Sequence, residues 1–118
     1  MSDLLQSVKI HGREYPLGYK VVTRDMKSLG LRKNPNILEF ELGKWIYLSK
    51  NEIEKSKNDW GGIWVARTLS SAKKLGDYML EKKHKPTRIF KATLDEILYF
   101  NSYRIKTNGV KLFAEILD

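Results

Sequence analysis

Apolar residues occur along this chain in short runs that are separated by polar turns. A continuous apolar run at residues 63–66 directly follows Gly61 and Gly62. The run is too short for a helix, and because both of its faces are apolar it predicts a strand in the middle of a sheet. Residues 70–83 have the spacing of an amphipathic helix. The apolar face of that helix carries Ala72, Leu75, Gly76 and Met79. We therefore expect a central strand covered by one helix.

Other segments alternate in polarity or are rich in β-branched and aromatic residues, and these patterns predict further strands. The predicted strands are residues 18–23, 38–42, 45–48, 88–94 and 97–100. Residues 8–15 predict a small hairpin that turns at His11 and Gly12. The strand at 45–48 is apolar on both faces, which favours a place inside the sheet. Residues 26–36 are rich in turn formers and predict a surface loop.

The dipeptide Asn108-Gly109 predicts a second hairpin, because Asn-Gly is the preferred centre of a type I′ turn. Lys106 would then lie opposite Lys111, and like charges at facing positions repel each other. Either a carboxylate such as Glu115 or a bound phosphate would offset this repulsion. The alternative is that both lysines are simply exposed to solvent. The outer face of this hairpin would carry Arg104, Lys106, Lys111, Phe113 and Glu115, and its core face Tyr103, Ile105, Thr107, Val110, Leu112 and Ala114.

These elements predict a single α+β domain over residues 1–118, with residues 1–7 as a loose arm. We expect a mixed, mostly antiparallel curved sheet of about six or seven strands and one main helix at 70–83. The strands at 63–66 and 88–94 flank that helix, which suits either a parallel crossover or a mixed sheet. The expected inner residues are Val21, Phe40, Ile46, Ile63, Val65, Leu75, Phe90, Ile105 and Leu112.

The amino-acid composition favours some classes of function and excludes others. The net charge of +8 is spread along the chain, so it predicts a basic surface that attracts polyanions, with nucleic acid the commonest partner. The absence of cysteine excludes disulfides, thiol catalysis and thiolate metal sites. His11 and His84 are far apart and lack carboxylates at ligand spacing, so we expect no metal site. The chain has no signal-peptide pattern and no apolar run of membrane-spanning length, which favours a cytoplasmic protein without membrane contact.

Three tryptophans are many for 118 residues. Trp45 and Trp64 fall in predicted strands and are expected in the core. Trp60 lies in a polar loop before the glycine pair, where it could contact a ligand.

The run Gly62-Ile63-Trp64-Val65-Ala66, followed by Ser70-Ser71-Ala72 and then Tyr78, resembles the strand of ADP-ribosyltransferase-like domains that leads into a helix beside the NAD pocket. It is also similar to small uncharacterised prokaryotic and phage domains that carry this strand and a late Arg-x-Lys strand, here Arg104-Ile105-Lys106. The resemblance implies a split, strongly curved sheet with the helix on one side.

For an enzyme of the first family, the resemblance implies NAD as the substrate. Lys20 would replace the usual His or Arg and hold phosphate, and Trp60 or Tyr78 would stack near the nicotinamide. Glu115, or else Glu96, would be the catalytic glutamate.

Three functions follow from these patterns. The leading hypothesis is a non-catalytic module, without a cofactor, that binds nucleic acid or a phosphorylated ligand through Arg104, Lys106, Lys111 and Phe113. The second is the NAD-using enzyme, and the third is a structural or protein-partner role.

Overall fold

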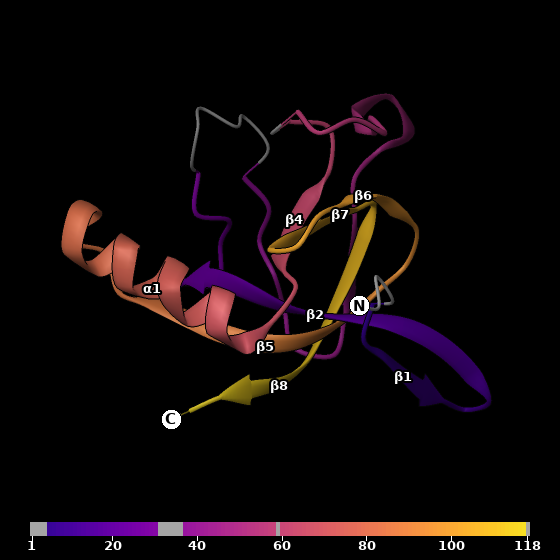
Figure 1. The fold of residues 1–118 in the computed structure, drawn as a ribbon, viewed down its shortest axis with the longest axis horizontal. Coiled ribbons are helices and arrows are strands. Elements are labelled where there is room, and N and C mark those ends of the chain that lie inside the picture. Colours follow the sequence, from indigo (N-terminus) through magenta and orange to yellow (C-terminus); the bar gives the residue numbers. More distant parts are fainter. Residues whose placement is uncertain (1–4, 31–36, 59, 118) are drawn as a thin grey trace.

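The computed structural model describes residues 5–30, 37–58 and 60–117. Over these residues the chain forms eight β-strands and one α-helix (Figure 1). The elements are β1 (Ser7–Ile10), β2 (Arg13–Thr23), β3 (Trp45–Tyr47), a 3₁₀ turn at Lys50–Glu52, β4 (Ile63–Ala66), α1 (Leu69–Lys83), β5 (Thr87–Leu94), β6 (Ile97–Phe100), β7 (Arg104–Thr107) and β8 (Gly109–Ile116).

The strands form one sheet in the order β3-β8-β5-β2-β4-β7-β6, and β1 pairs with the outer part of β2. Every strand pairing among the described residues is antiparallel. The expected α+β class and the mostly antiparallel character are thus confirmed. The expectation of a mixed sheet is wrong for the described strands, and the sheet has one or two strands more than expected. β4 lies between β2 and β7 as an interior strand, as its apolar faces indicate. β3 lies at one end of the sheet, so the interior position expected for residues 45–48 is wrong.

α1 carries the chain across the sheet between two strands that are not neighbours. β4 and β5 are both antiparallel to β2 and lie on opposite sides of it, so they run parallel to each other with β2 between them. The helix packs against β2, β4 and β5 (Figure 1). The two ends of the crossover are therefore parallel, which is one of the arrangements that the sequence leaves open, but a third strand separates them.

The caps of α1 explain its limits. The Thr68 hydroxyl accepts a hydrogen bond from the Ser71 N–H at 3.1 Å, which makes Thr68 the N-cap. His84 adopts a left-handed conformation with φ of 56°, and the chain leaves the helix there. Ala72 and Met79 are buried against the sheet, and Leu75 is partly buried. The helix predicted at 70–83 is confirmed to within one residue.

A two-residue turn joins β1 to β2. His11 and Gly12 have φ angles of 50° and 80°, and a type I′ turn needs positive φ at both central residues. The turn pairs Ile10 with Arg13 and confirms the hairpin expected here. Ser7 belongs to β1, so the loose arm expected at residues 1–7 is wrong at Ser7, while residues 1–4 lie outside the described residues.

The hairpin expected at Asn108-Gly109 does not form. Neither residue has a positive φ, and β7 and β8 pair with different partners in separate parts of the sheet. The Asn108 side chain instead accepts a hydrogen bond from the Glu96 N–H at 2.9 Å, while the Thr107 hydroxyl donates to the Glu96 carbonyl at 2.6 Å. These bonds tie the end of β7 to the turn before β6, so the chain passes from one part of the sheet to the other.

The two sides of the sheet have separate cores. Tyr19, Val21 and Ala66 pack with Ala72 beneath the helix. The larger cluster, on the other side, contains Val22, Phe40, Leu48, Ile63, Val65, Phe90, Ala92, Leu94, Ile105, Val110 and Leu112. Most of the expected inner residues are confirmed as buried, whereas Ile46 and Leu75 are only partly buried.

Two sequence patterns gave wrong predictions about local structure. Residues 38–42 form no strand beyond an isolated bridge between Lys27 and Glu39, and Leu42 is 56% exposed although Phe40 is buried. Tyr103, expected in the core, precedes β7 and is 72% exposed. Part of the loop expected at 26–36, residues 31–36, lies outside the described residues.

Candidate ligand pocket

A gap opens in the sheet where β2 and β4 separate. The two strands pair only at Tyr19 and Ala66. A continued antiparallel register would place Lys20 opposite Val65, but the strands diverge there. The side chain of Lys20 crosses the gap, and its Nζ donates a hydrogen bond to the Trp64 carbonyl at 2.8 Å. Because backbone carbonyls inside a protein need a donor, Lys20 takes over a role that strand pairing would otherwise fill.

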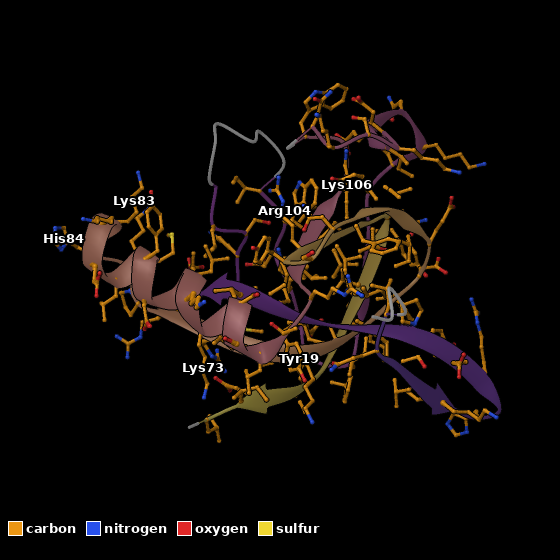
Figure 2. All side chains as sticks on the ribbon, in the orientation of Figure 1. Tyr19, Lys73, Lys83, His84, Arg104 and Lys106 are labelled. Atoms are coloured by element: carbon orange, nitrogen blue, oxygen red, sulfur yellow. The ribbon has the colours of Figure 1, made fainter. Side chains whose placement is uncertain are left out.

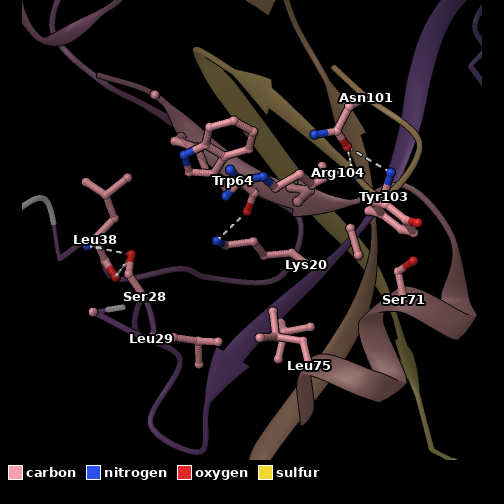
Figure 3. Close-up of a pocket in the computed structure, with 16 residues that line it drawn as sticks. Lys20, Ser28, Leu29, Leu38, Trp64, Ser71, Leu75, Asn101, Tyr103 and Arg104 are labelled. Atoms are coloured by element: carbon pink, nitrogen blue, oxygen red, sulfur yellow. Dashed lines mark hydrogen bonds between the residues drawn. The ribbon is translucent and has the colours of Figure 1, made fainter. Parts of the chain in front are cut away.

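This gap forms a pocket of about 440 Å³ (Figure 3). A volume of this size lies within the range of small-molecule sites, about 300–1,000 Å³. β2 and β4 form its walls together with the loop after β2, the first turns of α1 and the turn before β7. Beyond the strands, the lining side chains that Figure 3 labels are Ser28, Leu29, Leu38, Ser71, Leu75, Asn101 and Tyr103.

Lys20 gives the pocket its most unusual group. Only 7% of the residue is exposed, and its Nζ lies 5.3 Å from the centre of the Phe40 ring. Burial lowers the pKa of the Lys20 amine to about 8, because the surrounding protein solvates its charged form poorly. Figure 3 shows the amine pointing into the space between Trp64 and the segment that carries Ser28 and Leu38.

Arg104 brings a second cation to the pocket wall. Its guanidinium carbon lies 3.9 Å from the centre of the Trp64 ring, which is a close cation–π contact. The Asn101 side-chain oxygen accepts hydrogen bonds from the N–H groups of Tyr103 and Arg104, at 2.8 and 3.0 Å. Asn101 therefore fixes the turn that presents both residues to the pocket. Among the described residues that line the pocket there is no Asp or Glu, so its charged side chains are all positive.

The remaining lining is apolar with a few hydroxyl groups. Leu29, Leu38 and Leu75 face the cavity, and the Ser28 hydroxyl accepts a hydrogen bond from the Leu38 N–H at 3.0 Å. This pocket can hold an uncharged, partly apolar body beside a negatively charged group. Sequence reasoning identified Lys20 and Arg104 but missed the aliphatic and amide residues around them.

The basic face expected around Asn108-Gly109 is not present, because β7 and β8 do not pair. Lys106, on β7, is fully buried, lies opposite Trp64 of β4, and donates from Nζ to the Ser56 carbonyl at 3.0 Å. Lys111 lies on β8 opposite Trp45 of β3, and Phe113 is 37% exposed. Figure 2 shows Arg104 and Lys106 far from the exposed Lys73 and Lys83 of α1. Only Arg104 of the expected set lines the pocket.

The residues expected for NAD chemistry do not converge either. Lys20 lines the pocket, but Trp60, Tyr78 and Glu115 are not among its lining residues. The carboxylate of Glu115 binds the Arg88 guanidinium through two hydrogen bonds of 2.8 and 2.9 Å, and this contact lowers the pKa of Glu115. Glu96, the alternative glutamate, pairs with Lys55 at 3.0 Å. The expected single cleft for Lys20, Trp60, Tyr78 and Glu115 is therefore wrong.

A second hollow of about 180 Å³ lies beside the β1–β2 hairpin. Tyr15 and Trp45 line it with ring centres 5.8 Å apart, and the ring of Tyr47, outside the lining, lies 5.7 Å from that of Trp45. The Arg13 guanidinium lies 4.7 Å from the Tyr15 ring centre, and Lys111 lines the hollow. This surface combines aromatic and basic groups, as the sequence led us to expect at a different place.

No three His, Cys, Asp or Glu side chains of the described residues come together as a possible metal site. No helix in the described part of the chain is long and apolar enough to cross a membrane. Comparisons with protein-family models, curated proteins and solved structures found no match for this chain.

Proposed function

We propose that this protein binds a small phosphorylated molecule in the pocket between β2 and β4. The phosphate lies near Lys20 and Arg104, and the uncharged body of the ligand lies against Trp64 and the leucines of the opposite wall. The volume of about 440 Å³ supports a ligand of the size of a nucleotide or a phosphorylated vitamin rather than a polymer.

One observation carries this proposal: a buried lysine amine faces a pocket whose described lining includes no acid. A buried cation without a carboxylate partner is unfavourable, and a phosphate supplies the missing negative charge. Phosphate oxygens also accept the hydrogen bonds that ammonium and guanidinium groups donate. The net charge of +8 further favours anionic ligands over cationic ones.

Paired compounds that differ by one phosphate test this function. We would titrate AMP and pyridoxine 5′-phosphate, each beside its unphosphorylated parent, and follow the thermal unfolding midpoint and the heat of binding. We expect a phosphorylated compound to raise the midpoint, since a ligand at 100 times its dissociation constant adds about 2.7 kcal/mol to the free energy of unfolding. The unphosphorylated parents should have a much weaker effect.

Lys20→Met provides the site variant, and Lys73→Met provides a control with the same loss of charge on the exposed face of α1. Lys20→Met should weaken binding at least about tenfold, as expected for the loss of a charge-assisted hydrogen bond. Lys73→Met should bind like the unaltered protein. Equal affinity of the two variants, or equal effects of each phosphate and its parent, would contradict the proposal.

The second hollow favours another candidate function, the binding of single-stranded nucleic acid. Tyr15, Trp45 and Tyr47 follow one another beside Arg13 and Lys111, and bases stack on aromatic rings while basic groups contact the backbone. A fluorescently labelled oligonucleotide should bind more weakly to Lys111→Gln than to Lys73→Gln, and its affinity should fall steeply with salt. No binding at about 50 mM salt, where phosphate contacts are strong, would exclude this function.

A further inference from the structure

We propose that Lys20 forms a reversible imine with an aldehyde or ketone group of the pocket's ligand. This inference rests on the proposed phosphate pocket and adds a covalent bond to it. The ligand would then carry a carbonyl group as well as a phosphate, with the carbonyl carbon at the Lys20 Nζ and the phosphate nearer to Arg104.

The position of the amine suits this reaction. Nζ donates to the Trp64 carbonyl, and a neutral amine that donates one N–H still has its lone pair for attack on a carbonyl carbon. The amine also borders a cavity of about 440 Å³, so a small molecule can reach it even though little of the residue is exposed. The hydrogen bond limits the movement of the side chain and holds Nζ at the pocket wall (Figure 3).

Burial favours the neutral form of Lys20. Arg104 is the other charged side chain of the described lining, Tyr103 is a further titratable one, and Phe40 lies beneath the amine. Lysine nucleophiles are activated by apolar surroundings. The burial of Lys20 at this pocket provides such surroundings. With a pKa of about 8, roughly a quarter of the amine is neutral at pH 7.5, against about 0.1% of an ordinary lysine.

The reaction balances without an added oxidant or reductant. The nitrogen lone pair forms a C–N bond as the carbonyl π bond breaks, and one proton moves from nitrogen to oxygen to give a carbinolamine. The second proton of the amine then moves to the hydroxyl group, which leaves as water while the C=N bond forms. Addition of water reverses both steps and releases the ligand.

Pyridoxal 5′-phosphate and pyridoxine 5′-phosphate form a matched pair of probes, because they differ only in an aldehyde and an alcohol group. The full chain would be treated with the aldehyde at pH 7.5, reduced with borohydride and digested, and the labelled peptides would be quantified by mass spectrometry. We expect Lys20 to be labelled at least about tenfold more than the exposed Lys73, because its neutral fraction is larger. An excess of pyridoxine 5′-phosphate should suppress the label at Lys20 and leave that at Lys73 unchanged.

The possible outcomes distinguish a failure of the imine proposal from a failure of the proposed phosphate pocket. If pyridoxine 5′-phosphate binds but Lys20 is labelled no more than Lys73, the imine proposal is wrong and the proposed function stands. If Lys20 is labelled strongly but pyridoxine 5′-phosphate neither binds nor protects it, the amine is reactive and the phosphate pocket is wrong. If neither occurs, both are wrong. Lys20→Arg should lose the label at position 20, whereas Lys73→Arg, on the exposed face of α1, should leave the label at Lys20 unchanged.

Discussion

At the scale of single residues, Lys20 departs most from the behaviour of its residue type. Lysine is almost never fully buried unless it is paired. Lys20 is nevertheless enclosed between a backbone carbonyl of β4 and the ring of Phe40, two partners that carry no formal charge. Lys106, also buried, donates to the Ser56 carbonyl. The proposed pocket thus depends on the Lys20 amine, for which a backbone carbonyl and an aromatic ring take the place of most of the surrounding water.

The buried amine of Lys20 should make stability depend on pH. Its pKa is about 8 in the folded protein and 10.5 without burial, so between these values the unfolded chain binds more protons. The free energy of unfolding should therefore rise with pH from about 8 to about 10.5, by up to about 3 kcal/mol from this group. Urea unfolding across this range, compared with Lys20→Met, isolates the contribution. A difference between the two proteins that does not change with pH would contradict the lowered pKa.

At the scale of elements, β2 organises the molecule. It pairs with β5 over seven residue pairs but with β4 at a single pair. Gly18 sets the geometry at the junction, because a Cβ atom there would lie 2.6 Å from Val65 Cγ2. β2 and β4 therefore approach closely at one point and diverge beyond it, and this divergence creates the pocket.

Gly18→Ala should force β2 and β4 apart and destabilise the protein by about 1–3 kcal/mol, the usual cost of overpacking. Val65→Ala removes the methyl group that the new side chain would meet. The double variant should consequently be more stable than the sum of the two single effects predicts. Chemical denaturation of all four proteins measures this coupling, and strict additivity would show that the contact is unimportant.

The start of α1 allows a test of its capping. Thr68→Ala removes the oxygen that accepts from the Ser71 N–H and should cost about 1 kcal/mol. Ser70→Ala is the matched control, since Ser70 is exposed in the first turn and alanine is the better helix former. Thermal unfolding followed by circular dichroism should show a lower midpoint for Thr68→Ala alone. A larger loss for Ser70→Ala would move the cap to that residue.

At the scale of the whole molecule, the strand order predicts how stability is distributed. β2 and β5 have neighbours on both sides, whereas β3 and β6 end the path of paired strands. Hydrogen exchange should be slowest in β2 and β5, with opening free energies near that of global unfolding, and faster in β3 and β6. If β3 were protected as strongly as β2, the order of the sheet would have to be revised.

Local patterns predicted the elements of this fold better than their arrangement. The run at 63–66 and the periodicity of 70–83 identified an interior strand and its helix, because burial and helical spacing are local properties of a sequence. Asn108-Gly109 misled because turn preference is weaker than the pairing of β7 and β8 with other strands. The positive φ angles that a type I′ turn needs occur at His11 and Gly12 instead.

Only part of the candidate site could be predicted from the sequence. Lys20 lies on the same face of β2 as the buried Val22, because side chains two residues apart on a strand point the same way. The alternation of residues therefore already indicated a lysine that points inward. The approach of Ser28, Asn101 and Tyr103 to that lysine depends on chain segments far apart in sequence. No local pattern encodes such proximity. The basic face expected at Asn108-Gly109 was wrong for the same reason, because it depended on which strands β7 and β8 pair with.

The central position of β2 also has a consequence for synthesis. The ribosome makes β2 early, but its partners β4 and β5 are complete only at Ala66 and Leu94. Until then, β1 covers only the first residues of β2, and the apolar residues Val21 and Val22 lie in a tract with unpaired backbone edges. Unpaired edges of this kind recruit strands from other chains. We therefore expect the nascent polypeptide to be more prone to aggregate than the finished protein.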